Sequence, residues 1–212
     1  HHKTSQLTGK ISIGSGELKS SQFLAELITS FHKEHPQVQF EIYSGNADNI
    51  KERIDRGLLD MGLLVEPVNI LKYNFVRTPF KECWGVLVNE DSDLAEKKEV
   101  TAQELVRFPV IMTQREIVRN ELLNWFGDYS EQLQNIASGN LLYNLAALAR
   151  CRLGSVITLK MNCSYDGLRF IPFNPRLESG TVLVWKKAQV FSRASNAFID
   201  YTRQYLSTLR ND

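Results

Sequence analysis

One stretch decides the fold: residues 10–42 read KISIGSGELKSSQFLAELITSFHKEHPQVQFEI. Ile11 and Ile13 alternate with polar residues, which predicts a β-strand, and the glycines at 14 and 16 end it. Apolar residues then recur at spacings of three and four from Phe23 to Phe31, as on one face of a helix. Pro36 stops that helix, and residues 38–42 alternate again as a second strand.

The same alternation continues downstream. Either Asn46 or Asp48 can cap a short helix that Gly57 ends, and the apolar run Met61–Val65 has the length of a buried parallel strand. Residues 10–65 therefore alternate strand, helix, strand, helix, strand, which predicts a parallel sheet covered by helices. Two further strands are expected at Phe75–Thr78 and Trp84–Val88.

After the polar loop Asn89–Lys98, the alternation starts a second time. The expected elements are a helix capped by Thr101 and running through Val106, a strand at Val110–Met112, a helix at Ile117–Phe126, a strand ending at Ile136, a helix at Leu141–Leu153 capped by Asn140 and ended by Gly154, strands at Val156–Leu159, Leu168–Pro172 and Thr181–Trp185, and a last helix at Phe191–Leu209. We therefore expect two α/β units with a break near residues 80–90.

Composition and charge exclude several classes of protein. The chain has 212 residues, and its 25 basic and 24 acidic residues give a net charge of +1, without the basic stripe of a direct DNA-binding surface. Its apolar runs are all shorter than the roughly 18 residues that a membrane-spanning helix needs. The three cysteines, Cys83, Cys151 and Cys163, are widely spaced and cannot all pair, which favours a reducing cytoplasm.

Known catalytic, cofactor and metal motifs do not emerge from the sequence. Gly14-Ser15-Gly16 begins like a dinucleotide fingerprint, but Lys19 stands where the third glycine belongs. His32 and His35 lack a third metal ligand, and a solvated helix end suits them better. Cys83 and Cys151 are expected to be small core residues. We therefore predict no catalytic residue, no cofactor and no metal.

Four short polar loops follow strands and open helices: Ser15–Lys19, Gly45–Asn46, Thr113–Arg115 and Ser138–Asn140. Such loops lie at the carboxyl ends of parallel strands, where helix amino termini present free N–H groups. If both units turn this edge towards each other, a cleft results that suits a small, polar or anionic ligand. The alternative is that these polar residues only cap their helices.

The sequence resembles the effector-binding domain of LysR-type transcriptional regulators. The resemblance is carried by Leu7-Thr8-Gly9-Lys10-Ile11-Ser12-Ile13-Gly14, by Phe31-His32-Lys33-Glu34-His35-Pro36-Gln37-Val38, by Asn49-Ile50 through Arg56-Gly57-Leu58-Leu59-Asp60-Met61-Gly62-Leu63, and by Leu145 through Gly154-Ser155-Val156. It covers nearly the whole chain from Leu7 to the last helix.

This resemblance implies a fold like that of type 2 periplasmic binding proteins, with two Rossmann-like α/β subdomains joined by two crossover strands. Subdomain I is expected at residues 7–83 plus 175–212, and subdomain II at 84–174. The resemblance also implies an amino-terminal winged helix-turn-helix that binds DNA and lies outside these residues.

Carried over by position, the effector contacts implied by the resemblance are Ser15, Gly16, Leu18, Lys19, Asn46, Val65, Thr113, Gln114, Ser138 and Thr158. The sequence departs from the family pattern in three places. Arg152 replaces a glycine near the helix end, Leu159 replaces a proline beside Thr158, and Leu18 replaces a hydroxyl residue and makes that end of the cleft more apolar.

The expected function is sensing without chemistry: a small metabolite binds in the cleft and favours one conformation through its difference in affinity between conformations. A cytoplasmic homodimer, or a higher homo-oligomer, is expected. A solute-binding protein of a transport system is the main alternative, because it shares the fold. An enzyme on the same scaffold, such as a dehydratase or deaminase of small metabolites, is the third.

Overall fold

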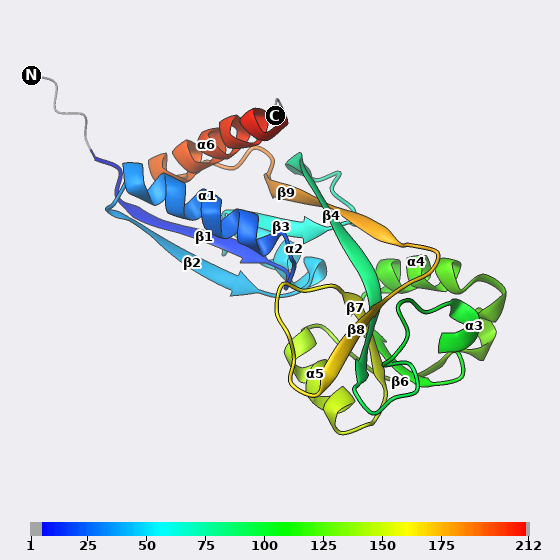
Figure 1. Cartoon of the computed structure of the whole chain (residues 1–212). Helices are drawn as coiled ribbons and strands as arrows, with labels where there is room; N and C mark the ends of the chain where they lie inside the picture. Colours follow the sequence, from blue (N-terminus) through cyan, green and yellow to red (C-terminus); the bar gives the residue numbers. More distant parts are fainter. Residues whose placement is uncertain (1–5, 211–212) are drawn as a thin grey trace, which may run out of the picture. The chain divides into compact units, whose positions relative to one another are not determined.

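The structure is a computed structural model that describes residues 6–210. The chain forms two compact units (Figure 1). Unit 1 takes the chain up to Gly16, Ser20–Phe80 and the chain from Gly180 onward, and unit 2 takes Glu17–Lys19 and Lys81–Ser179. The chain therefore leaves unit 1, builds almost all of unit 2, and returns.

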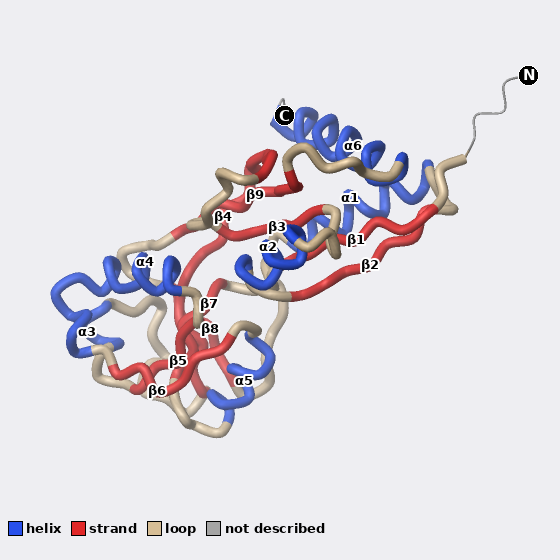
Figure 2. Tube along the Cα trace, turned by 180° about the vertical axis from the view of Figure 1, so that it is seen from behind, coloured by secondary structure: helices blue, strands red, loops and turns tan. Residues whose placement is uncertain are grey.

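Unit 1 is a sheet with helices on both faces (Figure 2). Its elements are β1 (Gly9–Ser15), α1 (Ser21–Glu34), β2 (Val38–Ser44), α2 (Ala47–Asp55), β3 (Met61–Val65), the first part of β4 (Tyr73–Asn89), most of β9 (Glu178–Lys186) and α6 (Arg193–Arg210). Strand β1 lies parallel between β2 and β3, and β3 pairs antiparallel with β9. The parallel βαβαβ order predicted from residues 10–65 is confirmed.

The two faces of this sheet are packed differently. Helices α1 and α6 lie together on one face (Figures 1 and 2), where Phe31 meets Phe198 edge-on with ring centroids 5.2 Å apart. Helix α2 covers the other face, where Ile50 and Ile54 are fully buried against Val182 and Val184 of β9. Burying these branched side chains away from water stabilises unit 1.

Unit 2 repeats the architecture. Its elements are the rest of β4, α3 (Ala102–Leu105), β5 (Pro109–Thr113), α4 (Glu116–Phe126), the 3₁₀ helix η1 (Gly127–Gln132), β6 (Gln134–Gly139), α5 (Leu142–Arg150), β7 (Ser155–Leu159) and β8 (Leu168–Pro172). Strand β5 lies parallel between β6 and β7, and β4 pairs antiparallel with β7 and β8. Helix α5 packs its buried face, including Leu145, Ala146 and Ala149, against Ile111 and Val156.

The sheets of both units belong to one hydrogen-bonded path, β2-β1-β3-β9-β4-β7-β5-β6, with β8 attached to β4. Strands β4 and β9 each carry residues of both units. The two strands predicted at Phe75–Thr78 and Trp84–Val88 are therefore wrong as separate elements, because β4 runs through both without a break.

Local capping rules succeed in part. Of the two candidate caps Asn46 and Asp48, Asn46 is the cap, and both it and the predicted Thr101 form a capping box with the residue three positions on. The prediction for Asn140 is wrong, because Leu141 holds the N-cap position before α5 and its side chain makes no cap. The expected end of this helix at Gly154 is also wrong, because the helix stops at Arg150 and Arg152 takes a left-handed φ of 62°.

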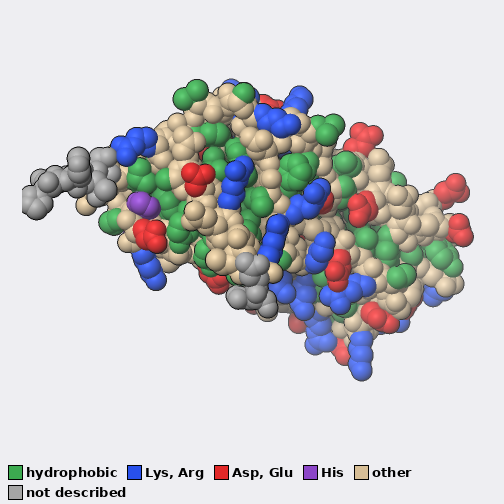
Figure 3. Space-filling model, turned by 90° about the horizontal axis from the view of Figure 1, so that it is seen from above, with side chains coloured by type: hydrophobic (Ala, Val, Ile, Leu, Met, Phe, Trp, Pro, Cys, Tyr) green, Lys and Arg blue, Asp and Glu red, His purple; other side chains and the backbone are tan. Residues whose placement is uncertain are grey.

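Two smaller expectations also change. Cys151 is exposed rather than a core residue, because it lies at the carboxyl end of α5 beyond the buried face, and Cys83 is half-buried. On the face seen in Figure 3, Lys and Arg side chains (blue) are interspersed with Asp and Glu side chains (red), which fits the net charge of +1.

Candidate functional site

In unit 1, four predicted contacts gather at the carboxyl edge of the sheet. Ser15 ends β1, pairs with Ser44 and Leu63 on the neighbouring strands, and is 5% exposed. Its hydroxyl donates to the carbonyl of Gly16 at 2.9 Å, and the Gly16 N–H donates to the Leu63 carbonyl at 3.4 Å. The Ser15 hydroxyl and the Gly16 N–H therefore already have hydrogen-bond partners within the protein.

Asn46 and Val65 complete this edge. The Asn46 side chain accepts from the Asn49 N–H at 2.9 Å, and the Asn46 N–H donates to Asn49 Oδ1 at 2.9 Å. Val65 ends β3 and pairs with Thr181 of β9. The side-chain oxygen of Asn46 therefore caps α2, as the alternative of simple helix caps expects.

The loop Glu17–Lys19 connects two elements of unit 1 but belongs to unit 2 by its contacts. The Glu17 carboxylate accepts from the backbone N–H of Leu142, with 2.7 Å between Oε2 and N. The Lys19 N–H donates to Glu82 Oε2 at 3.3 Å, and Leu18 is 5% exposed. An acidic side chain thus occupies the amino end of α5, where the helix dipole favours negative charge.

In unit 2, the predicted Thr113, Gln114 and Ser138 share one edge. Met112 pairs with Ser138 across the parallel strands β5 and β6, and the Gln114 N–H donates to the Gly139 carbonyl at 3.2 Å. Thr113 Oγ1 accepts from the Arg115 N–H at 3.3 Å. The side chains of Gln114 and Ser138 are exposed, so they remain open to a ligand.

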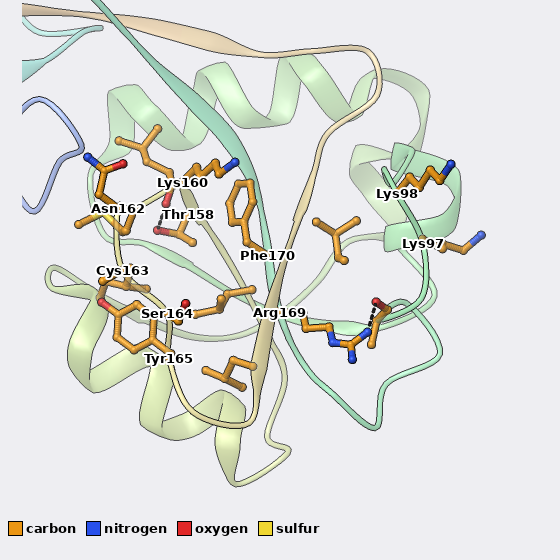
Figure 4. Close-up of a pocket in the computed structure, with 17 residues that line it drawn as sticks. Lys97, Lys98, Thr158, Lys160, Asn162, Cys163, Ser164, Tyr165, Arg169 and Phe170 are labelled. Carbon is orange, nitrogen blue, oxygen red and sulfur yellow. Dashed lines mark hydrogen bonds between the residues drawn. The ribbon is translucent and has the colours of Figure 1, made fainter.

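Thr158, on β7, lies instead in a cavity of about 740 Å³ within unit 2 (Figure 4). We call it the loop cavity, because the loop from Lys160 to Tyr165 forms much of its wall. Figure 4 labels Thr158, Lys160, Asn162, Cys163, Ser164, Tyr165 and Phe170 along this wall, and Lys97, Lys98 and Arg169 farther along the cavity. The Thr158 hydroxyl donates to the Leu159 carbonyl at 3.3 Å.

Tyr165 has a raised pKa in the loop cavity. Burial, followed by the neighbouring Cys163 thiol and more weakly by the Glu17 carboxylate, raises the pKa of Tyr165 to about 12. The phenol therefore stays protonated at neutral pH and is a hydrogen-bond donor. The Asn162 amide and the Ser164 hydroxyl add further uncharged polar groups to a cavity that also contains Lys97, Lys98, Lys160 and Arg169.

Sequence reasoning missed Glu17 and Tyr165. Glu17 lies in Ser15–Lys19, one of the four polar loops predicted from the sequence. Its negative charge was the feature that could have marked it as a contact for a helix amino terminus. Its partner is 125 residues away, so only the fold brings them together. Within residues 6–210, we find no group of three or more His, Cys, Asp or Glu side chains arranged to hold a metal. No helix within the same range is long and apolar enough to cross a membrane.

Comparison with known proteins gives a consistent assignment. Residues 4–207 match the family described as the LysR substrate binding domain. YwbI of Bacillus subtilis strain 168, an uncharacterized HTH-type transcriptional regulator, is 22% identical over 215 residues, which cover 96% of this chain and 69% of YwbI. YvbU of the same strain, also an uncharacterized HTH-type regulator, is 26% identical over 49% of this chain and 35% of its own length.

Solved structures share the fold. The effector-binding domain of QuiR in complex with shikimate has a TM-score of 0.82 at 19% identity, covering 95% of this chain and 99% of that one. The regulatory domain of CcmR from Synechocystis PCC6803 in complex with 2-PG has a TM-score of 0.75 at 14% identity, covering 94% of this chain and 98% of that one. The chain belongs to the LysR substrate-binding domain family, the effector-binding domains of LysR-type transcriptional regulators.

Proposed function

We propose that this chain senses a small polar metabolite on behalf of a LysR-type regulator, whose amino-terminal winged helix-turn-helix binds DNA. The observation that carries the proposal is the family match over residues 4–207, together with the polar carboxyl edges of the two units. Relatives that are HTH-type regulators favour this function over transport of a solute. The predicted subdomains, 7–83 plus 175–212 and 84–174, are assigned to units 1 and 2.

The proposed ligand contacts come from both units. In unit 1 they are Ser15, Gly16, Asn46 and Val65, and in unit 2 they are Leu18, Lys19, Thr113, Gln114, Ser138 and Thr158. Hydroxyl, amide and ammonium groups dominate this set, which suits a polar ligand that carries hydroxyl or carboxylate groups. A ligand shifts the conformational equilibrium only by its difference in affinity between conformations, so no catalytic step is required.

The experiment is a thermal-shift screen of the chain against small polar metabolites, followed by calorimetry of each hit. Shikimate and 2-PG are suitable first probes, because structural neighbours bind them. Gln114→Ala and Ser138→Ala, at the exposed carboxyl edge of unit 2, should each weaken binding of a hit by about tenfold, the loss of one hydrogen bond to a charged or polar group.

Asn135→Ala is the matched control, because Asn135 is an exposed polar residue on the same strand but lies near its amino end. It should leave the affinity unchanged. The proposal fails if every hit binds equally well to the Gln114, Ser138 and Asn135 variants. Cytoplasmic location and homodimer formation form part of the proposal, and light scattering of the purified chain tests the second.

A further inference from the structure

Unit 2 contains a second cavity, of about 490 Å³, which we call the basic cavity. The side chains of Lys19, Lys81, Lys160 and Arg176 line it, together with Glu99 and an apolar wall that includes Phe173. It shares Lys160 and Phe170 with the loop cavity. Four cationic side chains thus surround one small cavity.

The backbone holds the three lysines in place. Lys81 lies on β4, and Lys160 follows the end of β7, the strand that pairs with β4. The Lys160 N–H donates to the Cys83 carbonyl at 2.8 Å, which joins these two segments. The Lys19 N–H donates to the carboxylate of Glu82, next to Lys81, at 3.3 Å. The cluster is therefore built by three separate segments of the fold.

Ion pairs neutralise only part of the positive charge that lines the basic cavity. Arg176 pairs with Glu178 at 2.5 Å, and the Glu99 carboxylate accepts from the Asn174 amide at 3.0 Å. Across residues 6–210, the ammonium groups of Lys19, Lys81 and Lys160 form no ion pair within 4 Å. Three unpaired ammonium groups thus face a single carboxylate, and an anion in the cavity would reduce their mutual repulsion.

We propose that the basic cavity binds a small organic anion with two or more negative charges. The charge count calls for more than one anionic group, and Phe170 and Phe173 offer an apolar wall to a carbon skeleton. Phe173 is itself held in place, because it stacks on Trp125 with ring centroids 3.8 Å apart. This site lies within unit 2 and goes beyond the proposed effector contacts, of which it includes only Lys19.

Calorimetric titration of the chain with citrate at low ionic strength tests the site. Citrate should bind saturably at one site, and the double variant Lys81→Gln/Lys160→Gln should bind it at least about tenfold more weakly, since two of the unpaired charges are gone. Raising the salt concentration should also weaken binding, because all three lysines are exposed. The single variant Lys160→Gln, expected to lose about threefold, serves if the double variant folds poorly.

The matched control is Lys33→Gln/Lys72→Gln, which removes the same charge from exposed positions of unit 1 and should leave citrate affinity unchanged. Gln114→Ala, which tests the proposed effector contacts, should also leave it unchanged. The inference is overturned if citrate fails to saturate the wild-type chain, if both lysine double variants weaken it equally, or if Gln114→Ala abolishes it. The first two outcomes leave the metabolite screen of the proposed function unaffected, and the third would place citrate at the proposed effector contacts.

Discussion

The carboxylate of Glu17 accepts a hydrogen bond from the backbone N–H of Leu142, with 2.7 Å between the two atoms. This contact supplies the acceptor that a side-chain cap would otherwise give to α5, since Leu141 at the cap position has none. It also fastens the loop after β1 to unit 2. The pair explains how one loop can be attached by sequence to unit 1 and by contacts to unit 2.

Glu17→Ala should therefore loosen the first turn of α5. Loss of a capping acceptor costs about 1 kcal/mol, and loss of the charge alone about 0.3–1 kcal/mol, so Glu17→Gln should be milder than Glu17→Ala. Hydrogen exchange of the amides at 142–145 measures the effect, which should be faster exchange in Glu17→Ala. Glu34→Ala, an exposed acid at the end of α1, should leave this exchange unchanged. Equal exchange in all variants would show that the contact contributes nothing to α5.

Tyr73 couples stability to high pH. Its phenol, 2% exposed, donates to Asp55 Oδ1 at 2.6 Å, and burial followed by this hydrogen bond raises the pKa of Tyr73 above its ordinary value. The unfolded chain then loses this proton first. The free energy of unfolding should stay level below about pH 10 and fall above it, by at most about 1.4 kcal/mol per pH unit.

Urea unfolding of wild type and Tyr73→Phe between pH 7 and 11 isolates this group from the other tyrosines. At neutral pH the variant should lose about 1 kcal/mol, the net value of one hydrogen bond. Above about pH 10 the difference between the two proteins should shrink. A difference that stays constant with pH would contradict the assignment.

Gly62 allows α2 to approach the sheet of unit 1. A Cβ at this position would lie 2.6 Å from Cγ2 of Ile50, which is fully buried. Gly62→Ala should therefore destabilise unit 1 by about 1–3 kcal/mol through overpacking. Ile50→Ala removes the obstructing methyl group, so the double variant should cost less than the two single variants together. Strict additivity in denaturant unfolding would exclude the steric explanation.

Arg152 holds the left-handed conformation, φ 62°, that glycine adopts most easily. The resemblance placed a glycine at this position, and the structure supplies the physical reason for it. Arg152→Gly should be more stable than Arg152→Ala by about 1 kcal/mol, because both lose the ion pair with Asp91 and only glycine relieves the backbone. Thermal unfolding compares the two variants, and equal midpoints would refute the argument.

Local patterns predicted most of the fold. Pro36, the Asn46 capping box and the apolar run Met61–Val65 act within a few residues, so their signals are visible in the sequence. The cap of α5 could not be predicted, because its acceptor comes from Glu17, and a rule based on neighbours selected Asn140 instead. The continuity of β4 was also missed, since Pro79 and the charged residues after it interrupt the apolar alternation.

Part of the candidate site could likewise be predicted from the sequence, and part could not. The position of Ser15, Gly16, Thr113 and Ser138 at strand ends follows from the βα order, and the register places them there. The environment of Thr158 does not follow from that order, because the cavity around it is built by the loop between β7 and β8. The basic cavity likewise combines Lys19, Lys81 and Lys160 from distant segments, so a local sequence pattern cannot predict it.

The path of the chain through the units has a consequence for synthesis on the ribosome. Unit 2 is almost continuous in sequence, whereas unit 1 needs α6, which follows unit 2 along the chain, to bury Phe31 beneath Phe198. Domains generally fold as they emerge, so unit 2 can assemble while the first half of unit 1 still waits for its final segment. The apolar face of α1 then stays uncovered until α6 has been made.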